Sequence, residues 1–208
     1  MLDEIGSGDM VQGSLTYFTL GRFNNPNSAL ALNGGWTYVP SGIYFDTPEF
    51  TISVWIYPQN IGRCARLIDF SNSNSRDFTN NIYIRLDERC YTNQYNYTPE
   101  LAIYSSSQLQ VNCISSHAFT FGEWQFFAAT FNGSVMRLYI NGNQTCQTTT
   151  AYTLPTMSRI YNYIGKTSDP FDGYSASILD DLRFYNKRLT QSQILQLMNE
   201  SQTSNFCC

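Results

Sequence analysis

The sequence has 208 residues, a net charge of −4, 13% charged residues and 15% aromatic residues. Its 12 lysines and arginines are scattered, with only Lys187 and Arg188 adjacent, so no basic stripe is present to neutralise nucleic-acid phosphates. No apolar run approaches the roughly 20 residues of a membrane-spanning helix. The composition disfavours nucleic-acid binding and membrane insertion, and it is typical of an extracellular β-protein with a polar surface.

Short strand patterns recur along the chain after a Gly-, Ser- and Asn-rich start, residues 1–28, that holds one apolar segment, Leu15–Leu20. In chain order the predicted strands are Ala29–Leu32, Trp36–Val39, Phe50–Tyr57, Arg66–Phe70, Asn81–Leu86, Glu100–Tyr104, Gln108–Cys113, Trp124–Phe131, Val135–Ile140, Tyr161–Ile164 and Ser177–Tyr185. Many short strands with regular turn signals predict an all-β fold, a two-sheet antiparallel jelly-roll sandwich. No linker or internal repeat divides the chain, so we expect residues 1–208 to form a single domain.

One short C-terminal helix is predicted after the last strand. Thr190 is a suitable N-cap because its hydroxyl can accept a hydrogen bond from a backbone N–H in the first turn. The apolar face of this helix is expected to contain Ile194, Leu195, Leu197 and Met198.

The most informative local pattern is a hairpin. Residues 124–131 alternate with the period of a strand, and Asn132-Gly133 predicts a two-residue turn with positive φ at both positions. Residues 135–140 then return, and Asn141-Gly142 ends that strand.

The hairpin sequence GEWQFFAATFNGSVMRLYINGN, residues 122–143, resembles the signature hairpin of the laminin-G-like and concanavalin A-like lectin/glucanase superfamily. Residues 29–35 and 50–58 resemble the opening strands of that superfamily, and residues 164–194 resemble its closing strand and terminal helix. The resemblance implies a jelly roll. It does not choose a function, because the superfamily holds lectins, adhesion modules, glycosidases and structural spacers.

Six cysteines without a C-x-x-C pair predict structural disulfides and an oxidising compartment. They are Cys64, Cys90, Cys113, Cys146, Cys207 and Cys208. A Cys90–Cys113 bond would hold the segment between them rigid. The adjacent Cys207 and Cys208 are expected to bond different partners, either Cys64 or Cys146 within the domain or a cysteine of another chain.

Four Asn-x-Ser/Thr sequons also favour secretion: Asn96, Asn132, Asn143 and Asn199. The first residues lack the charged and apolar regions of a signal peptide. Either a leader has been removed or these residues belong to a longer protein.

Catalysis is not expected. A retaining glycosidase needs two carboxyl groups about 5 Å apart, hence same-face neighbours on a strand. Asp87 and Glu88 are consecutive and would point to opposite faces, and His117 has no nucleophile nearby. Three further glutamates are isolated along the chain: Glu49, Glu100 and Glu123.

A structural calcium site is implied by the resemblance. Asp3 and Asp9, with backbone oxygens of the loop between them, would bind the ion together with Asp180 or Asp181. Strand alternation puts Asp180 on the face of its apolar neighbours, so it is expected to be buried. In the alternative interpretation, Asp181 pairs with Arg183 or Arg188 and the loop aspartates only form turns.

Two segments are candidates for contact with a glycan or a protein. Tyr91, Tyr95 and Tyr97 lie in a polar segment suited to either kind of partner. Asp169 and Asp172 lie in a loop that resembles those of calcium-dependent lectins, although Asp-Pro and Asp-Gly are also ordinary turn formers.

An apparently missing first strand completes the argument for function. Related domains begin with an apolar strand before the Asp-containing loop, whereas only Met1 and Leu2 precede it here. An open edge would accept a strand from another chain; alternatively, Leu15–Leu20 supplies the strand. We therefore expect a non-catalytic, secreted adhesion or structural module that self-associates or binds other extracellular proteins, forming an assembly or filament by strand exchange. The alternative is a calcium-dependent carbohydrate-binding lectin.

Overall fold

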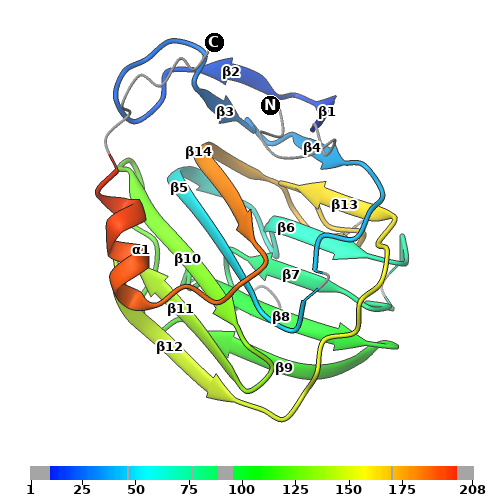
Figure 1. Cartoon of the computed structure of the whole chain (residues 1–208). Helices are drawn as coiled ribbons and strands as arrows, with labels where there is room; N and C mark the ends of the chain where they lie inside the picture. Colours follow the sequence, from blue (N-terminus) through cyan, green and yellow to red (C-terminus); the bar gives the residue numbers. More distant parts are fainter. Residues whose placement is uncertain (1–9, 46, 76, 89–95, 170, 201–208) are drawn as a thin grey trace, which may run out of the picture.

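The structure is a computed structural model that describes residues 10–45, 47–75, 77–88, 96–169 and 171–200. Two antiparallel sheets of seven strands each pack face to face (Figure 1). Sheet A has the order β1 (Val11–Ser14), β4 (Trp36–Val39), β13 (Tyr161–Ile164), β6 (Arg66–Ser71), β7 (Ile82–Arg85), β8 (Glu100–Ser105) and β9 (Gln108–Ile114). Sheet B has the order β12 (Asn143–Thr149), β11 (Val135–Ile140), β10 (Gln125–Phe131), β5 (Phe50–Ile61), β14 (Ser175–Tyr185), β3 (Ala29–Ala31) and β2 (Tyr17–Thr19). The predicted jelly-roll sandwich is confirmed.

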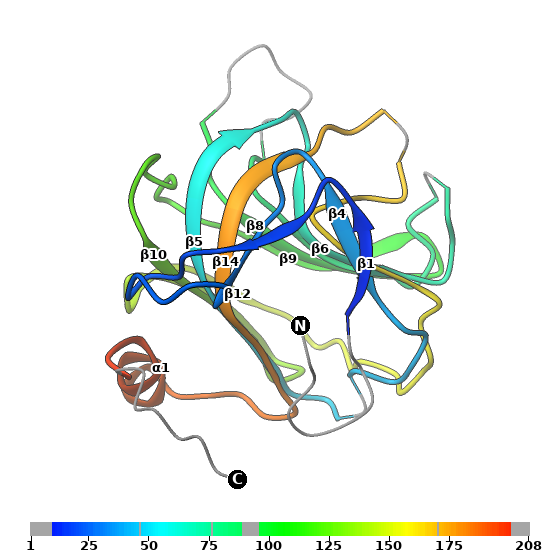
Figure 2. The same cartoon turned by 90° about the horizontal axis from the view of Figure 1, so that it is seen from above.

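The core lies between the sheets and follows from strand alternation. On β5, Ile52, Val54 and Ile56 are fully buried, as are Phe127 and Phe131 on β10. Burying each such side chain contributes about 1.5–3 kcal/mol. The long strands β5 and β14 run antiparallel beside each other and curve strongly (Figure 2). Because the two sheets pack face to face, one face of sheet A lies in this core and its opposite face is turned outward.

Helix α1 (Gln191–Met198) begins as the sequence predicts. The Thr190 side chain accepts a hydrogen bond from the backbone N–H of Gln193, and the Gln193 side chain accepts one from the backbone N–H of Thr190. Ile194 packs against Phe126 on the outer face of sheet B (Figure 1). Leu195, expected on the apolar face, is 38% exposed, because Ile194, Leu197 and Met198 are the residues that turn toward the sheet.

The tight turn of the hairpin region occurs at the second Asn-Gly pair. Asn141 and Gly142 both have positive φ, 49° and 75°, and Ile140 pairs directly with Asn143. The turn therefore has the backbone conformation of a two-residue type I′ hairpin. It leads into β12, which the sequence analysis missed.

The prediction of a two-residue turn at Asn132-Gly133 is wrong. Only Gly133 has positive φ, 78°. The backbone N–H of Asn132 donates to the Val135 carbonyl at 3.3 Å, so the turn is centred on Gly133 and Ser134, one residue later than predicted. The Asn132 Oδ1 accepts hydrogen bonds from the backbone N–H groups of Ser134 and Val135, at 3.2 and 2.7 Å. The Asn132 side chain therefore stabilises this shifted turn.

The N-terminal part supplies two strands, and one of them lies in the segment Leu15–Leu20, as the alternative interpretation expected. Strand β1 pairs with β4 in sheet A. Strand β2 comes from the apolar segment Leu15–Leu20 and pairs with β3 at the edge of sheet B. Of the loop proposed to precede them, Asp3 and Asp9 lie outside the described residues.

A disulfide joins the two sheets at one edge of the sandwich. Cys113 on β9 bonds Cys146 on β12, with 5.9 Å between their Cα atoms (Figure 1). This bond rules out the proposed Cys90–Cys113 pair, and it removes Cys146 as a partner of the terminal cysteines. Cys64 is also disulfide-bonded.

Candidate functional site

A hollow of about 250 Å³ lies between the β6–β7 and β13–β14 loops, beside the outer face of sheet A. Its lining is mostly polar, with one aromatic ring: Asn74, Lys166, Thr167, Ser168, Asp169, Asp172 and Tyr174. Six of these seven residues come from the single loop between β13 and β14. The shape of that loop therefore determines the hollow.

Local turn chemistry forms the first half of the β13–β14 loop. The Asp169 Oδ1 accepts a hydrogen bond from the backbone N–H of Phe171 at 3.0 Å. The Thr167 Oγ1 accepts one from the backbone N–H of Asp169 at 3.1 Å. Asp169 thus acts as the turn former that the alternative interpretation expected.

Glycines attach the second half of the loop to the β5–β6 turn. The backbone N–H of Gly173 donates to the Arg63 carbonyl at 2.6 Å, and that of Gly62 donates to the Tyr174 carbonyl at 3.0 Å. A Cβ atom at Gly173 would lie 2.9 Å from the Arg63 nitrogen. Only glycine permits so close an approach, which holds Asp172 and Tyr174 in place.

Beneath the hollow, a buried charged cluster joins the loop to sheet A. Arg66 is completely buried, and its guanidinium lies 3.7 Å from Asp69 and 3.7 Å from Asp172. The same guanidinium lies over the Tyr83 ring, 3.7 Å from its centroid. Burial raises the pKa of the Tyr83 hydroxyl, so it stays protonated. Arg66 therefore links β6, β7 and the loop electrostatically.

The buried carboxyls of this cluster have raised pKa values. Burial raises the pKa of Asp172 to about 6, although Arg66 acts in the opposite direction. Burial also raises the pKa of Asp69, again opposed by Arg66. In both cases desolvation of the charged form outweighs the nearby positive charge. Asp172 is thus mostly ionised at pH 7 and takes up a proton just below it.

Two polar atoms in the hollow lack hydrogen-bond partners among the described residues. They are the Ser168 Oγ and the Asp172 Oδ2, both buried. An unsatisfied buried polar atom costs about 1–3 kcal/mol. The wall of the hollow therefore contains a hydroxyl and a carboxylate oxygen without hydrogen-bond partners among the described residues, and the carboxylate oxygen lies 3.7 Å from the Arg66 guanidinium.

Aromatic rings border the hollow. Lys166 Nζ lies 4.4 Å from the Trp36 ring centroid and 4.7 Å from that of Tyr163. The Tyr163 hydroxyl donates to the Asn74 Oδ1 at 3.4 Å. On the loop itself, Tyr174 is 44% exposed and Phe171 is 72% exposed. Polar groups and exposed rings therefore lie together at one place on the surface.

The candidate contact residues do not form one site. Asp169 and Asp172 both line the hollow. Tyr97 lies elsewhere, with its ring edge-on to Phe121 at 4.7 Å, and Tyr91 and Tyr95 lie outside the described residues. Sequence analysis missed four further polar lining residues and the ring beside them: Asn74, Lys166, Thr167, Ser168 and Tyr174.

Asp180 and Asp181 lie on the far side of the molecule, in β14. Asp180 is buried, as expected, and its Oδ2 accepts a hydrogen bond from the backbone N–H of Arg22 at 3.0 Å. The Arg22 side chain forms an ion pair with Asp181. Asp181 has a φ of 50°, and the strand is irregular there, so the simple alternation assumed for Asp180–Phe184 is interrupted. Arg22 occupies the neighbourhood proposed for calcium, while Asp3 and Asp9 lie outside the described residues.

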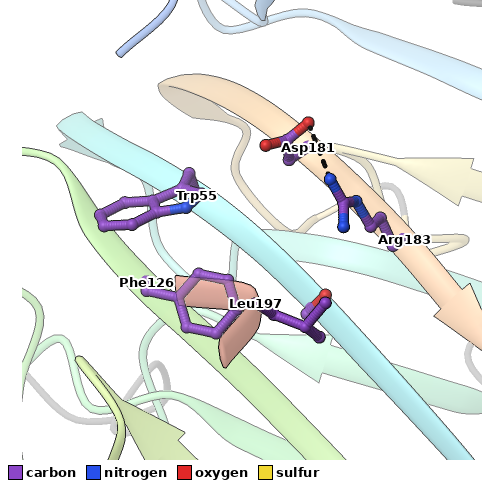
Figure 3. Close-up of a pocket in the computed structure, with 6 residues that line it drawn as sticks. Trp55, Phe126, Asp181, Arg183 and Leu197 are labelled. Carbon is purple, nitrogen blue, oxygen red and sulfur yellow. Dashed lines mark ion pairs between the residues drawn. The ribbon is translucent and has the colours of Figure 1, made fainter. Parts of the chain in front are cut away.

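Asp181 also contacts Arg183, at 3.6 Å, as the alternative interpretation expected. Figure 3 shows this pair beside the Trp55 and Phe126 rings and Leu197 of α1. The crevice that these residues line has no room for a water molecule. It is a packed contact between α1 and sheet B, whereas the polar hollow has room for a ligand.

The remaining candidates are placed as follows. The sequon residues Asn143 and Asn199 are exposed, whereas Asn96 and Asn132 are half-buried; glycosylation at all four stays a prediction. His117 is exposed beside Ser116. Glu100 is buried and forms an ion pair with Arg85.

Two further findings concern metals and membranes. Within the described ranges, no group of three or more His, Cys, Asp or Glu side chains is arranged to hold a metal ion. In the same part of the chain, no helix has the length and apolar composition needed to cross a bilayer.

The two packed sheets, the terminal helix and the loop-built hollow define a jelly roll of the lectin-like class. Residues 32–195 match the family model described as the concanavalin A-like lectin/glucanases superfamily. The chain belongs to this superfamily. No curated protein matches the sequence.

Several solved structures share the fold at low sequence identity. Domain 4 of AbnA, an extracellular arabinanase from Geobacillus stearothermophilus solved with arabinotriose, is 19% identical with a TM-score of 0.69, over 93% of this chain and 88% of that one. The ligand-binding domain of botulinum neurotoxin serotype D, solved with N-acetylneuraminic acid, is 15% identical with a TM-score of 0.64, over 92% and 46%. The binding domain of Paraclostridial Mosquitocidal Protein 1 is 16% identical with a TM-score of 0.62, over 93% and 47%. This chain thus spans about half of each toxin domain.

Proposed function

We propose that this protein is a non-catalytic carbohydrate-binding module and that the hollow between the β6–β7 and β13–β14 loops is its sugar site. The observation that carries the proposal is the combination of polar lining and exposed rings at that hollow. Sugar hydroxyls donate to and accept from Asn, Ser and Asp side chains, while the apolar face of a sugar ring packs on an aromatic ring. Tyr174 lines the hollow and would take the second role.

The comparisons support a binding role at the level of fold. The chain belongs to a superfamily described by its lectins and glucanases. Among the structural neighbours, one was solved with arabinotriose and another with N-acetylneuraminic acid. These neighbours suggest the class of ligand without identifying it.

The surroundings of the acidic residues support a non-catalytic role. Glu100 is held by Arg85 and by the Asn112 amide at 2.8 Å. The Glu88 Oε1 accepts a hydrogen bond from Asn96 at 3.1 Å. These contacts tie the carboxylates to structural partners.

Secretion is part of the proposal. The Cys113–Cys146 bond supports it, because disulfides persist in oxidising compartments. The four sequons would then be open to glycosylation.

Replacing Tyr174 with alanine is expected to weaken glycan binding at least tenfold, because the sugar loses its stacking surface. Binding would be measured by calorimetry with the strongest ligand from a glycan screen. Tyr17→Ala, which removes an exposed ring on β2, serves as the control and should leave affinity unchanged. Equal affinities of the wild type and Tyr174→Ala would refute the assignment of the site.

Removing calcium with a chelator tests the calcium proposal through two measurements, the melting temperature and the glycan affinity. If Asp3, Asp9, Asp180 and Asp181 hold a structural calcium ion, chelation should lower the melting temperature of the protein. Calcium-dependent sugar binding would in addition abolish affinity in the chelator.

Self-assembly is the second candidate function, and one observation favours it. Strand β2 is an edge strand of sheet B, and large apolar side chains on it and beside it are about half exposed: Leu15, Tyr17, Phe18 and Leu20. Exposed apolar edge strands pair readily with other chains. Strand exchange at this edge would join subunits into a polymer.

We expect the double substitution Tyr17→Lys/Phe18→Lys to abolish any assembly, because charge on an edge strand opposes edge-to-edge pairing. Electron microscopy and light scattering would compare it with Leu109→Lys, on the opposite sheet at β9. A monomeric wild type, or filaments that survive the double substitution, would contradict assembly through β2.

A further inference from the structure

We infer that the hollow takes the terminal unit of a neutral oligosaccharide and rejects sugars that carry a carboxylate. This inference rests on the proposed function and adds the class of ligand. It follows from the volume of the hollow, from its unsatisfied polar atoms and from the charges that face it.

The volume matches a small part of a glycan. A hollow of about 250 Å³ has the volume of about eight water molecules in the liquid. One sugar ring with part of the next fits such a space, whereas a long glycan chain does not. The site is therefore suited to the end of a chain.

Hydroxyl groups of a ligand are suitable hydrogen-bond partners for the two unsatisfied atoms of the lining. The Ser168 Oγ can donate or accept a hydrogen bond, and the ionised Asp172 can only accept. Neither atom has a hydrogen-bond partner among the described residues, although the Asp172 Oδ2 lies 3.7 Å from the Arg66 guanidinium. A sugar presents hydroxyls that both donate and accept, so neighbouring hydroxyls can satisfy both atoms. A carboxylate could not donate to Asp172.

The charges oppose an acidic ligand. Two carboxylates, Asp169 and Asp172, line the hollow, against one cation, Lys166. The Lys166 ammonium lies over the Trp36 and Tyr163 rings. Arg66 does not contribute to the lining, because it is completely buried behind Asp172. The side chains that line the hollow therefore carry one more negative than positive charge, which Arg66 behind Asp172 offsets in part. Like charges repel strongly where water is partly excluded.

Matched pairs of ligands test the inference on the full chain: neutral oligosaccharides, and the same oligosaccharides capped with N-acetylneuraminic acid. The neutral members are expected to bind and the capped ones to bind at least tenfold more weakly. Ser168→Ala should weaken binding of the neutral members at least threefold. Asp169→Asn keeps a side-chain oxygen for the loop turn and should narrow the difference between neutral and capped ligands at least threefold. Glu123→Gln, an exposed carboxylate outside the hollow, should leave that difference unchanged.

The outcomes separate the two proposals, given circular dichroism spectra that show each variant to be folded. Capped glycans that bind as well as or better than the neutral ones overturn the selectivity inference while carbohydrate binding stands. If Asp169→Asn leaves the difference in affinity between neutral and capped ligands unchanged, the charge of the hollow is not the cause of the selectivity. No binding to either member of any pair refutes the proposed function, and the inference with it.

Discussion

Replacing Arg66 with alanine is expected to lower the free energy of unfolding by about 3–5 kcal/mol, because breaking a buried ion pair leaves the opposite charges unpaired. Asp69 and Asp172 would both lose the guanidinium that lies 3.7 Å from each. The substitution also removes the packing on the Tyr83 ring. Urea denaturation at pH 7 measures the loss.

This loss should be larger at pH 7 than at pH 5. The pKa of Asp172 is about 6 in the folded protein, above its ordinary value of 3.8. The folded state thus holds the proton more tightly, and the stability contributed by this group is lost as the pH rises through 6. Without Arg66 the folded pKa rises further, so ionisation at pH 7 costs more. At pH 5 the Asp172 carboxyl can be protonated, which reduces the penalty.

Arg137→Ala is the matched control for Arg66→Ala. Arg137 bonds Gln147 on the exposed surface of β11 and β12 at 2.9 Å, and its loss should cost less than about 0.5 kcal/mol. A loss of under 1 kcal/mol for Arg66→Ala, or one independent of pH, would contradict the role of the buried cluster.

The double substitution Cys113→Ala/Cys146→Ala is expected to lower the free energy of unfolding by about 3–4 kcal/mol, because the disulfide restricts the unfolded chain. The two cysteines are 33 residues apart. They join β9 to β12, edge strands of different sheets, so the bond also closes the sandwich. Urea denaturation again measures the change.

Thr149→Ala, an exposed position on the same edge strand, provides the comparison and should change the free energy by less than about 0.5 kcal/mol. Peptide mapping under non-reducing conditions should recover a fragment that links Cys113 to Cys146. Recovery of a Cys90–Cys113 fragment in its place would show that the two sheets are not joined in this way.

Much of the fold could be predicted from the sequence. In strands such as Phe50–Ile61 and Gln125–Phe131, successive side chains point to opposite faces of the sheet, and both faces are largely buried. The apolar residues at these positions made the strands recognisable in the sequence. The edge strand Asn143–Thr149 is polar on both faces and gave no such signal. Strand β2 was visible only as a short apolar segment, because much of its surface is exposed. Backbone hydrogen bonds to a neighbouring strand hold these edge strands in place, and the local sequence of an edge strand does not show which strand will lie beside it.

The turns show a different limit. Both Asn-Gly pairs carry the same short-range signal, yet only Asn141-Gly142 adopts positive φ at both positions. At the other pair, the Asn132 side chain satisfies two backbone N–H groups. The choice between the two conformations depends on strand register, which the dipeptide does not encode.

The hollow could be predicted only in part. Asp169 and Asp172 belong to one loop and were recognised as candidates together. Asn74 comes from the distant β6–β7 loop, and it joins them because β13 pairs with β6. The importance of Ser168 rests on a buried hydroxyl that has no hydrogen-bond partner in the described part of the chain, and no local sequence pattern reveals this.

The most direct test of the sugar site is amide chemical-shift mapping of the full chain by NMR, titrated with a neutral oligosaccharide that it binds. The account predicts that the largest shifts fall on residues 166–169 and 171–174, with a smaller group around Asn74. Shifts concentrated around Tyr97, or along β2, would place the ligand elsewhere and contradict the assignment of the sugar site to the hollow.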